Sequence, residues 1–462
     1  MSEHHSRKSS HLSLPRSPLT RAIHPDDLDL NDSIRQVHQA ISSDISVSTA
    51  FRNPTPIDLI TIQRKLGEIK IDQFNNNLNQ NSISSKISLN SNLSDQNILE
   101  YKRDTNPTLA QVEQALGSVL NGQVLVYSSG LSAAFAALMA LSPDVIAIRG
   151  GYPGSHQTIK RYCQLRGMND RNSVEVRVID LDDSFPTPDT GLKVLVWLET
   201  PVNPTGECRD IKSYVKKVRD CAPGSELLVD STFAPPPLSN PFAFGADLVL
   251  HSATKYFGGH SDAIAGLLVV QKSNASRWKR LWHDRTYLGM LPGSLESWLL
   301  LRSLKTLQIR VIHQSDTSTR LAVWLNSLTE RDYRSDTDPD EKRRLVLRVW
   351  HSSFQDGGRW VGFDPQTNHP RQMMGGGSPC FSFMLRRPIQ AKWLPHLTKI
   401  FIPAATLGGV ESLIQHQIRS DSSADPRIVR VSVGLEDFQD LRNDLIQAFD
   451  RVIKYEHHHS KL

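Results

Sequence analysis

From Leu109 onward, short apolar runs alternate with longer segments whose apolar residues fall on one helical face. Helices are expected near residues 109–120 and from residue 131, and strands over residues 124–127, 145–148, 174–179, 194–198 and 227–229. This alternation predicts an α/β fold with a mostly parallel sheet and helices on both faces. Ligands of such sheets gather beyond the carboxyl ends of the strands, so functional residues are expected where the apolar runs end.

The pattern divides the chain into four regions. We expect a tail, an arm and an Asn-rich insertion over residues 1–108, a large domain over 109–310, a smaller C-terminal α/β domain over 311–452, and a tail over 453–462. A helical run over residues 295–328 is expected to bridge the two domains, and the charged segment 332–344 to be a solvated loop. Residues 1–30 and 74–97 have little capacity to bury apolar surface, which predicts a disordered tail and an inserted surface loop.

Composition excludes several classes of function. Hydrophobic residues make up 39% of the 462 residues and charged residues 22%, which is typical of a soluble globular protein. The most apolar stretch, 131–141, is too short to span a bilayer, and no secretory signal is expected. The net charge is +5, with much of the basic excess near the N-terminus, so we expect no nucleic-acid partner. The four cysteines are scattered, which argues against a metal site or a disulfide framework.

Two apolar runs end near groups with complementary chemistry. Residues 227–229 lead into Asp230, and residues 248–250 lead towards Lys255, 25 residues after Asp230. That spacing fits one crossover between neighbouring parallel strands, which would place both side chains at one edge of the sheet. A lysine after a strand is usually only a solvated strand end. Pyridoxal 5′-phosphate (PLP), however, needs both an amine for its aldehyde and an anion that keeps its ring nitrogen protonated.

A strand is also expected to turn directly into a helix at residues 128–134, because Ser128, Ser129 and Gly130 separate two apolar segments. Backbone N–H groups at a helix start bind phosphate, and glycine permits close approach. The alternative is a serine that caps the helix without any ligand.

Residues 229–233 and 245–262 resemble, nearly residue for residue, the PLP signature of the Cys/Met-metabolism (transsulfuration) family. That family contains cystathionine γ-synthases, cystathionine β- and γ-lyases, methionine γ-lyases and homoserine sulfhydrylases. Further similar segments extend the resemblance over residues 44–52 and 101–450. It implies the type I fold of PLP-dependent transferases, with a smaller C-terminal α/β domain, and PLP as the cofactor.

The resemblance also implies roles for individual residues around the cofactor. Lys255 would carry PLP as a Schiff base and act as the catalytic base, with Asp230 on the ring nitrogen. The ring would be stacked by Tyr152, although Pro153 and His156 depart from the family pattern there. The phosphate would be bound by backbone groups of Gly130 and Leu131 and by the hydroxyls of Ser252 and Thr254. The side-chain amide of Asn203 would contact the phenolic oxygen of the cofactor. Thr232 would support Asp230 or the ring, unless it is an ordinary strand hydroxyl.

Substrate and partner contacts follow from three more similar segments. Arg430 matches the family arginine that binds the substrate's α-carboxylate. That contact is bidentate, and a lysine would not reproduce it. Thr406 lines the same site and replaces the family's usual serine. Tyr101 and Arg103 match residues that reach the PLP phosphate of an adjacent subunit, which implies a homo-oligomer built as a dimer of active-site-sharing dimers. In a monomer these two residues would simply be a solvated helix-entry loop.

The shared motifs leave the exact reaction open. Cystathionine γ-synthase activity, which joins cysteine to an O-acylated homoserine, is our first expectation, and cystathionine β- or γ-lyase activity is the alternative. A non-catalytic paralogue would be expected to lose Lys255, Asp230 or Arg430, and all three are present. An aminotransferase of the same fold has different residues around the lysine.

The last three residues, Ser460, Lys461 and Leu462, match the peroxisomal address that a receptor reads at an exposed C-terminus. A chance match in a polar tail would instead leave the protein in the cytosol. We therefore expect peroxisomal import, with the cytoplasm as the alternative.

Overall fold

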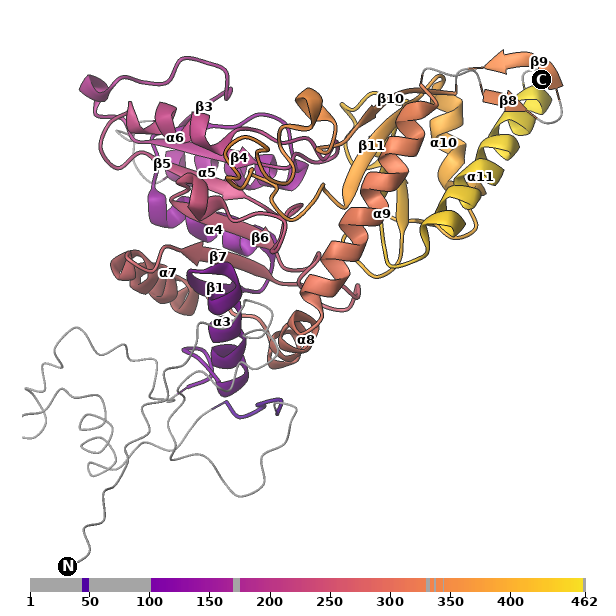
Figure 1. The fold of residues 1–462 in the computed structure, drawn as a ribbon. Helices are drawn as coiled ribbons and strands as arrows, with labels where there is room; N and C mark the ends of the chain where they lie inside the picture. Colours follow the sequence, from indigo (N-terminus) through magenta and orange to yellow (C-terminus); the bar gives the residue numbers. More distant parts are fainter. Residues whose placement is uncertain are drawn as a thin grey trace, which may run out of the picture.

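The structure is a computed structural model that describes residues 44–49, 101–168, 175–329, 333–335, 338–343 and 345–459. The expected tail over 1–30, the Asn-rich insertion over 74–97 and the C-terminal tripeptide lie outside these residues. Figure 1 shows two sheets side by side, with the long helix α9 (Leu307–Ser327) passing from the larger towards the smaller.

The larger sheet has seven strands in the order β1-β7-β6-β5-β4-β2-β3. Strands β2 to β6 run parallel to one another, and β7 is antiparallel to both of its neighbours. This confirms the mostly parallel α/β fold. The strands are β1 (Gln123–Tyr127), β2 (Val145–Ala147), β3 (Arg177–Ile179), β4 (Val194–Glu199), β5 (Glu226–Asp230), β6 (Leu248–Ser252) and β7 (Gly266–Val270).

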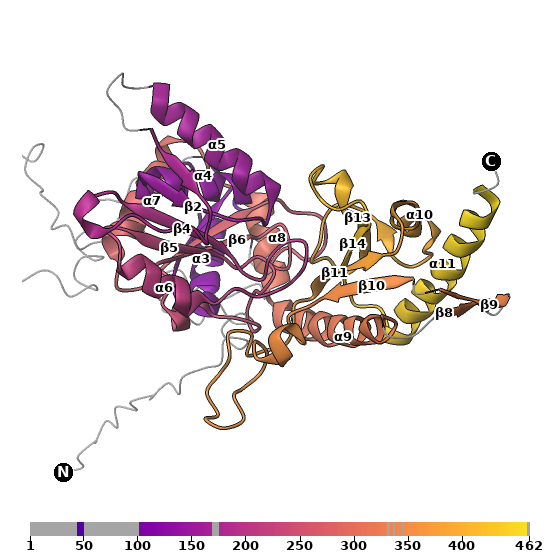
Figure 2. The ribbon, with the colours of Figure 1, turned by 90° about the horizontal axis from the view of Figure 1, so that it is seen from above.

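Helices cover both faces of this sheet, because alternate strand residues point to opposite sides. On one face Val196, Leu198 and Val229 pack with buried residues of α3, α6 and α8, whereas on the other Trp197 and Leu228 pack with α4, α5 and α7. Figure 2 shows the sheet edge-on between α4, α5 and α7 above and α6 below. The helices are α3 (Pro107–Leu120), α4 (Gly130–Leu141), α5 (Pro153–Met168), α6 (Ile211–Arg219), α7 (Ala275–Tyr287) and α8 (Ser294–Leu304).

The smaller sheet has five strands in the order β10-β11-β14-β13-β12, with only the β12–β13 pair parallel. Its core joins aromatic and aliphatic residues of the sheet with α9, α10 and α11. The elements are β10 (Val346–Trp350), β11 (Cys380–Leu385), α10 (Pro388–Leu397), β12 (Ile402–Pro403), β13 (Leu413–His416), β14 (Ile428–Ser432) and α11 (Phe438–His459).

The predicted helical run over 295–328 is present as two helices, α8 and α9, which Lys305 and Thr306 separate. One local expectation was wrong. The charged segment 332–344 contains two antiparallel strands, β8 (Tyr333–Ser335) and β9 (Asp338–Arg343), and is not simply a loop. Backbone pairing of such a ribbon does not require apolar side chains, so the hydrophobic pattern gave no sign of it. The domain boundary near residue 310 stays a prediction.

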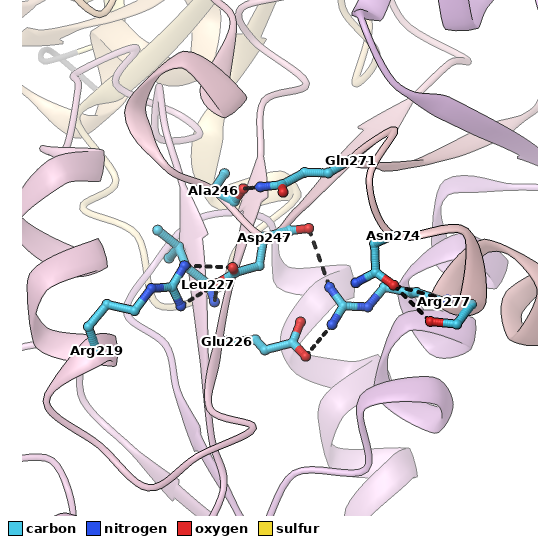
Figure 3. Close-up of polar contacts among 9 residues, drawn as sticks. Arg219, Glu226, Leu227, Ala246, Asp247, Gln271, Asn274 and Arg277 are labelled. Atoms are coloured by element: carbon cyan, nitrogen blue, oxygen red, sulfur yellow. Dashed lines mark hydrogen bonds and ion pairs between the residues drawn. The ribbon is translucent and has the colours of Figure 1, made fainter.

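Charged side chains hold together the amino ends of β5 and β6 (Figure 3). Arg219 donates to both oxygens of Asp247 at 3.0 and 2.6 Å, and Asp247 also accepts the backbone N–H of Leu227 at 2.8 Å. Arg277 forms an ion pair with Glu226, the first residue of β5. This network fixes the edge of the sheet that lies opposite the carboxyl ends of these strands.

Candidate active site

Three neighbouring parallel strands each end in a polar residue at the same edge of the large sheet. β4 ends at Glu199, β5 at Asp230 and β6 at Ser252. Glu199 pairs with Asp230 in the strand register, so the two acidic residues lie side by side. Both are buried, with exposed fractions of 6%. Two buried carboxylates therefore meet where a parallel sheet places its ligands.

Asp230 is held by the residue predicted to support it. Thr232 donates to Asp230 Oδ1 from its hydroxyl at 2.6 Å and from its backbone N–H at 3.0 Å. The same hydroxyl accepts the N–H of Ser252 at 2.9 Å, which ties the end of β5 to the end of β6. Burial raises the pKa of Asp230, and the bonds from Thr232 act against that rise. A cation beside this carboxylate would stabilise its charged form.

Lys255 lies three residues beyond β6 and reaches the small domain. Its Nζ donates to Thr406 Oγ1 at 2.9 Å, which joins residues 151 positions apart in the chain. The backbones of the segments around Lys255 and Thr406 also lie close together, because a Cβ on Gly408 would be 2.8 Å from the backbone N of Tyr256. Burial, followed by the positive charge of Arg430, lowers the pKa of Lys255 to about 8. An appreciable fraction of the amine is then neutral near physiological pH, as a nucleophile or a base requires.

Arg430 on β14 is a buried cation whose hydrogen-bond partners within the described residues are all neutral oxygens. Its Nη2 donates to Gln415 Oε1 at 2.6 Å, Ala405 O at 2.7 Å and Thr406 O at 3.2 Å. Its Nη1 donates to Asn203 Oδ1 at 3.3 Å. A buried charge without a counterion is costly, so this guanidinium suits an anionic ligand such as a substrate carboxylate. Gln415, which sequence reasoning missed, orients it.

The Asn203 amide is oriented by the same contact. Because its Oδ1 accepts from Arg430, its NH₂ group is the part that remains available as a donor. That is the group predicted to contact the phenolic oxygen of the cofactor. Its backbone N–H donates to Glu199 Oε1 at 2.7 Å.

The start of α4 lies against the end of β6, as a phosphate site requires. Ser129 caps the helix, so the N–H groups of Gly130 and Leu131 have no acceptor within it. A Cβ on Gly130 would lie 3.2 Å from both Cβ and Oγ of Ser252, so glycine permits this close approach. Thr254 Oγ1 instead bonds to the backbone N and O of Ala265, at 3.2 and 3.3 Å. The structure thus brings together Gly130, Leu131 and Ser252, while Thr254 secures the adjoining turn.

Tyr152 precedes α5 and is 47% exposed, with its ring folded over Gly154. Its backbone N–H donates to Glu199 Oε2 at 2.7 Å. Burial, followed by the charge of Asp230, raises the pKa of Glu199. Glu199 was not among the predicted site residues, although a carboxylate that ends a run of five apolar residues was a usable signal.

Tyr101 and Arg103 lie before α3, and both are exposed. The Arg103 guanidinium stacks on the Tyr101 ring at 5.0 Å. Their predicted role requires a second subunit and stays a prediction.

The residues of this site fit PLP. Free N–H groups at a helix start and the hydroxyl of Ser252 suit its phosphate. The Asp230 carboxylate, which forms no ion pair with any described residue, suits a protonated ring nitrogen. Lys255 supplies an amine with a lowered pKa. Within the same described residues, no group of His, Cys, Asp and Glu side chains could hold a metal ion, and no helix is long and apolar enough to cross a membrane.

Comparisons with known proteins agree with this geometry. Residues 73–450 match the family described as Cys/Met metabolism PLP-dependent enzyme. A cystathionine gamma-synthase of Mycobacterium tuberculosis is 33% identical over 369 residues, covering 76% of this chain and 86% of that protein. The cystathionine gamma-lyase of Saccharomyces cerevisiae is 30% identical over 369 residues, covering 76% of this chain and 87% of that protein. The solved structure of the yeast cystathionine gamma-lyase has a TM-score of 0.69 at 26% identity, covering 96% of this chain and 100% of that one.

Proposed function

Because this chain belongs to the family of Cys/Met metabolism PLP-dependent enzymes, we propose that it is a cystathionine γ-synthase. It is a PLP-dependent enzyme of transsulfuration, either a synthase or a carbon–sulfur lyase. The finer assignment is a γ-replacement in which the sulfur of cysteine bonds to Cγ of an O-acylated homoserine, the Cγ–O bond breaks and the acyloxy group leaves as a carboxylate. The observation that carries the reaction class is the Lys255 amine, with its lowered pKa, next to Arg430, a buried guanidinium that has no counterion among the described residues. The similarity to a cystathionine gamma-synthase supports the finer assignment.

Each residue of the site has a role that follows from its position. Bound here, PLP supplies an aldehyde that amines can attack and a ring that accepts electrons from Cα. We assign to Arg430 the α-carboxylate of the substrate, which fixes the amino acid relative to Lys255. The Lys255 amine, freed by the substrate amine, takes the proton from Cα at its Nζ, and Thr406 orients that nitrogen. Asp230 keeps its negative charge towards the ring nitrogen with the help of Thr232.

Similarity to known enzymes supports the choice of a synthase over a lyase. The Mycobacterium synthase is 33% identical to this chain and the yeast lyase 30%. The second candidate is therefore a cystathionine β- or γ-lyase, favoured by the similarity to the yeast enzyme. A non-catalytic paralogue is disfavoured because Lys255 and Arg430 both contact Thr406, and Asp230 ends β5, the strand next to the one that precedes Lys255.

A product assay tests this proposal. The purified protein is offered cystathionine alone, and separately cysteine with O-acetyl- or O-succinylhomoserine. Formation of cystathionine from the second mixture is the expected result. Pyruvate from cystathionine would indicate a β-lyase and 2-oxobutyrate a γ-lyase. No product from either mixture would contradict the assigned reaction class.

Replacing Arg430 with lysine should mainly weaken substrate binding. Lysine keeps the charge but cannot make a two-pronged contact, and it cannot reach all the acceptors around Nη1 and Nη2. We expect KM for the amino-acid substrate to rise about 10- to 100-fold, a loss of roughly 1–3 kcal/mol typical of charged hydrogen bonds. Steady-state kinetics measure this change, with Arg427→Lys as the control because the Arg427 side chain pairs, among the described residues, with Asp425 two positions away and not with the site. An unchanged KM would remove Arg430 from substrate binding.

We also propose that the active site is shared between subunits of a homo-oligomer. The support is the exposure of Tyr101 and Arg103, whose family counterparts act on a neighbouring subunit's cofactor. In this proposal their side chains complete the phosphate site of the adjacent chain.

Peroxisomal import through Ser460, Lys461 and Leu462 is a further proposal. A fluorescent protein fused to the N-terminus, which leaves this end free, should give puncta that become diffuse when Leu462 is removed. Diffuse fluorescence with the C-terminus intact would contradict import and leave the catalytic assignment unchanged.

A further inference from the structure

Glu199 joins two loops that follow different strands of the large sheet. Its Oε2 accepts the backbone N–H of Tyr152 and its Oε1 accepts that of Asn203, both at 2.7 Å. Tyr152 follows β2 and Asn203 follows β4. A single carboxylate thus binds the backbone of both loops at the edge where the site is built.

The approach of the first loop depends on glycine. Gly151 has φ +84°, and a Cβ there would lie 2.4 Å from Glu199 Oε2. A side chain at this position would displace the carboxylate or the loop, and the positive φ disfavours any other residue. Position 151 therefore offers a second, independent way to disturb the same contact.

The two residues that Glu199 binds, Tyr152 and Asn203, are predicted to contact different parts of the cofactor. Tyr152 presents an aromatic ring and Asn203 an amide, and the Asn203 amide also accepts from Arg430 at 3.3 Å. A shift of either loop would move a predicted cofactor contact, and a shift of Asn203 would also disturb the arginine. The two hydrogen bonds to Glu199 come from backbone N–H groups, so they fix the Cα positions of Tyr152 and Asn203, from which the two side chains extend.

Only a carboxylate offers acceptors on both of its oxygens. Glutamine at position 199 could accept one of the two N–H groups, but its NH₂ would face the other donor. The side chain is 6% exposed, so water cannot readily replace the lost acceptor.

We propose that Glu199 is a positioning residue, which holds Tyr152 and Asn203 in their places around the bound cofactor through two backbone N–H groups. The inference rests on the proposed function, because it takes PLP to bind between these side chains. It assigns Glu199 no direct contact with substrate and no proton transfer.

The test compares Glu199→Gln with the wild-type holoenzyme in three measurements. Visible circular dichroism of the bound cofactor should weaken, because the ring is held less firmly. kcat should fall about 10- to 100-fold, the scale expected when reacting groups are misplaced by about 1 Å. Hydrogen exchange measured by mass spectrometry should become faster in peptides that contain Tyr152 and Asn203.

The matched control is Glu226→Gln, the same chemical change in a partly buried carboxylate on the neighbouring strand. Glu226 lies at the opposite end of the sheet and pairs with Arg277 (Figure 3). This variant should lower Tm while leaving the visible spectrum and kcat unchanged. Gly151→Ala should reproduce the spectral and kinetic changes of Glu199→Gln, and it tests the proposal even if Glu199→Gln does not fold.

Wild-type circular dichroism and kcat in both Glu199→Gln and Gly151→Ala would overturn the proposal. So would unchanged exchange at Tyr152 and Asn203, or equal losses in Glu226→Gln. Failure of the proposed function would appear separately, as wild-type protein that binds no PLP or makes no product.

Discussion

Lys255→Ala should abolish turnover. The substitution removes the amine proposed both to hold the cofactor and to take the Cα proton, so kcat should fall by about 10⁴-fold or more. The absorbance of the lysine-bound cofactor near ~420 nm should be lost or shifted even where PLP is retained without a covalent bond. Fold and thermal stability should change little, because Nζ has a single hydrogen bond within the described part of the chain, to Thr406.

Lys272→Ala is the control for this experiment. Lys272 follows β7, is exposed and lies at the opposite edge of the same sheet. Its removal takes away one lysine without affecting the site, so absorbance and kcat should match the wild type. Wild-type turnover by Lys255→Ala, measured with the same product assay, would refute the central assignment.

The sequence predicted the large domain well because its strands are buried on both faces. The runs that form β1, β4 and β5 are continuous and apolar, and the bounds of these three predicted strands lie within one residue of those observed. The strand predicted over 174–179 begins only at residue 177, where β3 starts. Asp230 and Lys255 could be placed at one edge because parallel strands have a common direction. The smaller domain was harder, since contacts such as Gln415 with Arg430 arise from antiparallel pairing of strands that no local pattern specifies.

Glu199 shows why part of the site was not predicted. The motif that follows it, which contains Thr200, Pro201 and Asn203, predicted a cofactor contact for Asn203 but no partner for the Glu199 carboxylate. The partners of that carboxylate are backbone N–H groups. Backbone donors have no residue identity, so a sequence does not reveal them. Gly151 carried a usable signal, because a glycine beside a predicted cofactor contact often marks close approach. The meeting of Lys255 with Thr406 likewise depends on how the two domains pack.

Asp230→Asn should leave PLP bound but weaken the chemical step. Asparagine has the same shape, and its Oδ1 can still accept from Thr232, so the ends of β5 and β6 should stay in place. A neutral amide cannot hold the ring nitrogen protonated, so the cofactor accepts electrons less well. We expect kcat to fall about 10²- to 10³-fold, the usual effect of removing one electrostatic group from an active site.

Asp247→Asn makes the same substitution at the other end of the sheet, where Asp247 binds Arg219 and the backbone of Leu227. This control should lower thermal stability and leave kcat unchanged, which separates loss of charge at the cofactor from loss of a structural carboxylate. Single-turnover measurements isolate the chemical step from binding and release. An Asp230→Asn enzyme with unchanged kcat and raised KM would place Asp230 in substrate binding. Reduced turnover in single-turnover measurements, together with retained cofactor absorbance, would instead locate its charge at the ring nitrogen, as its burial beside Glu199 at the end of β5 leads us to expect.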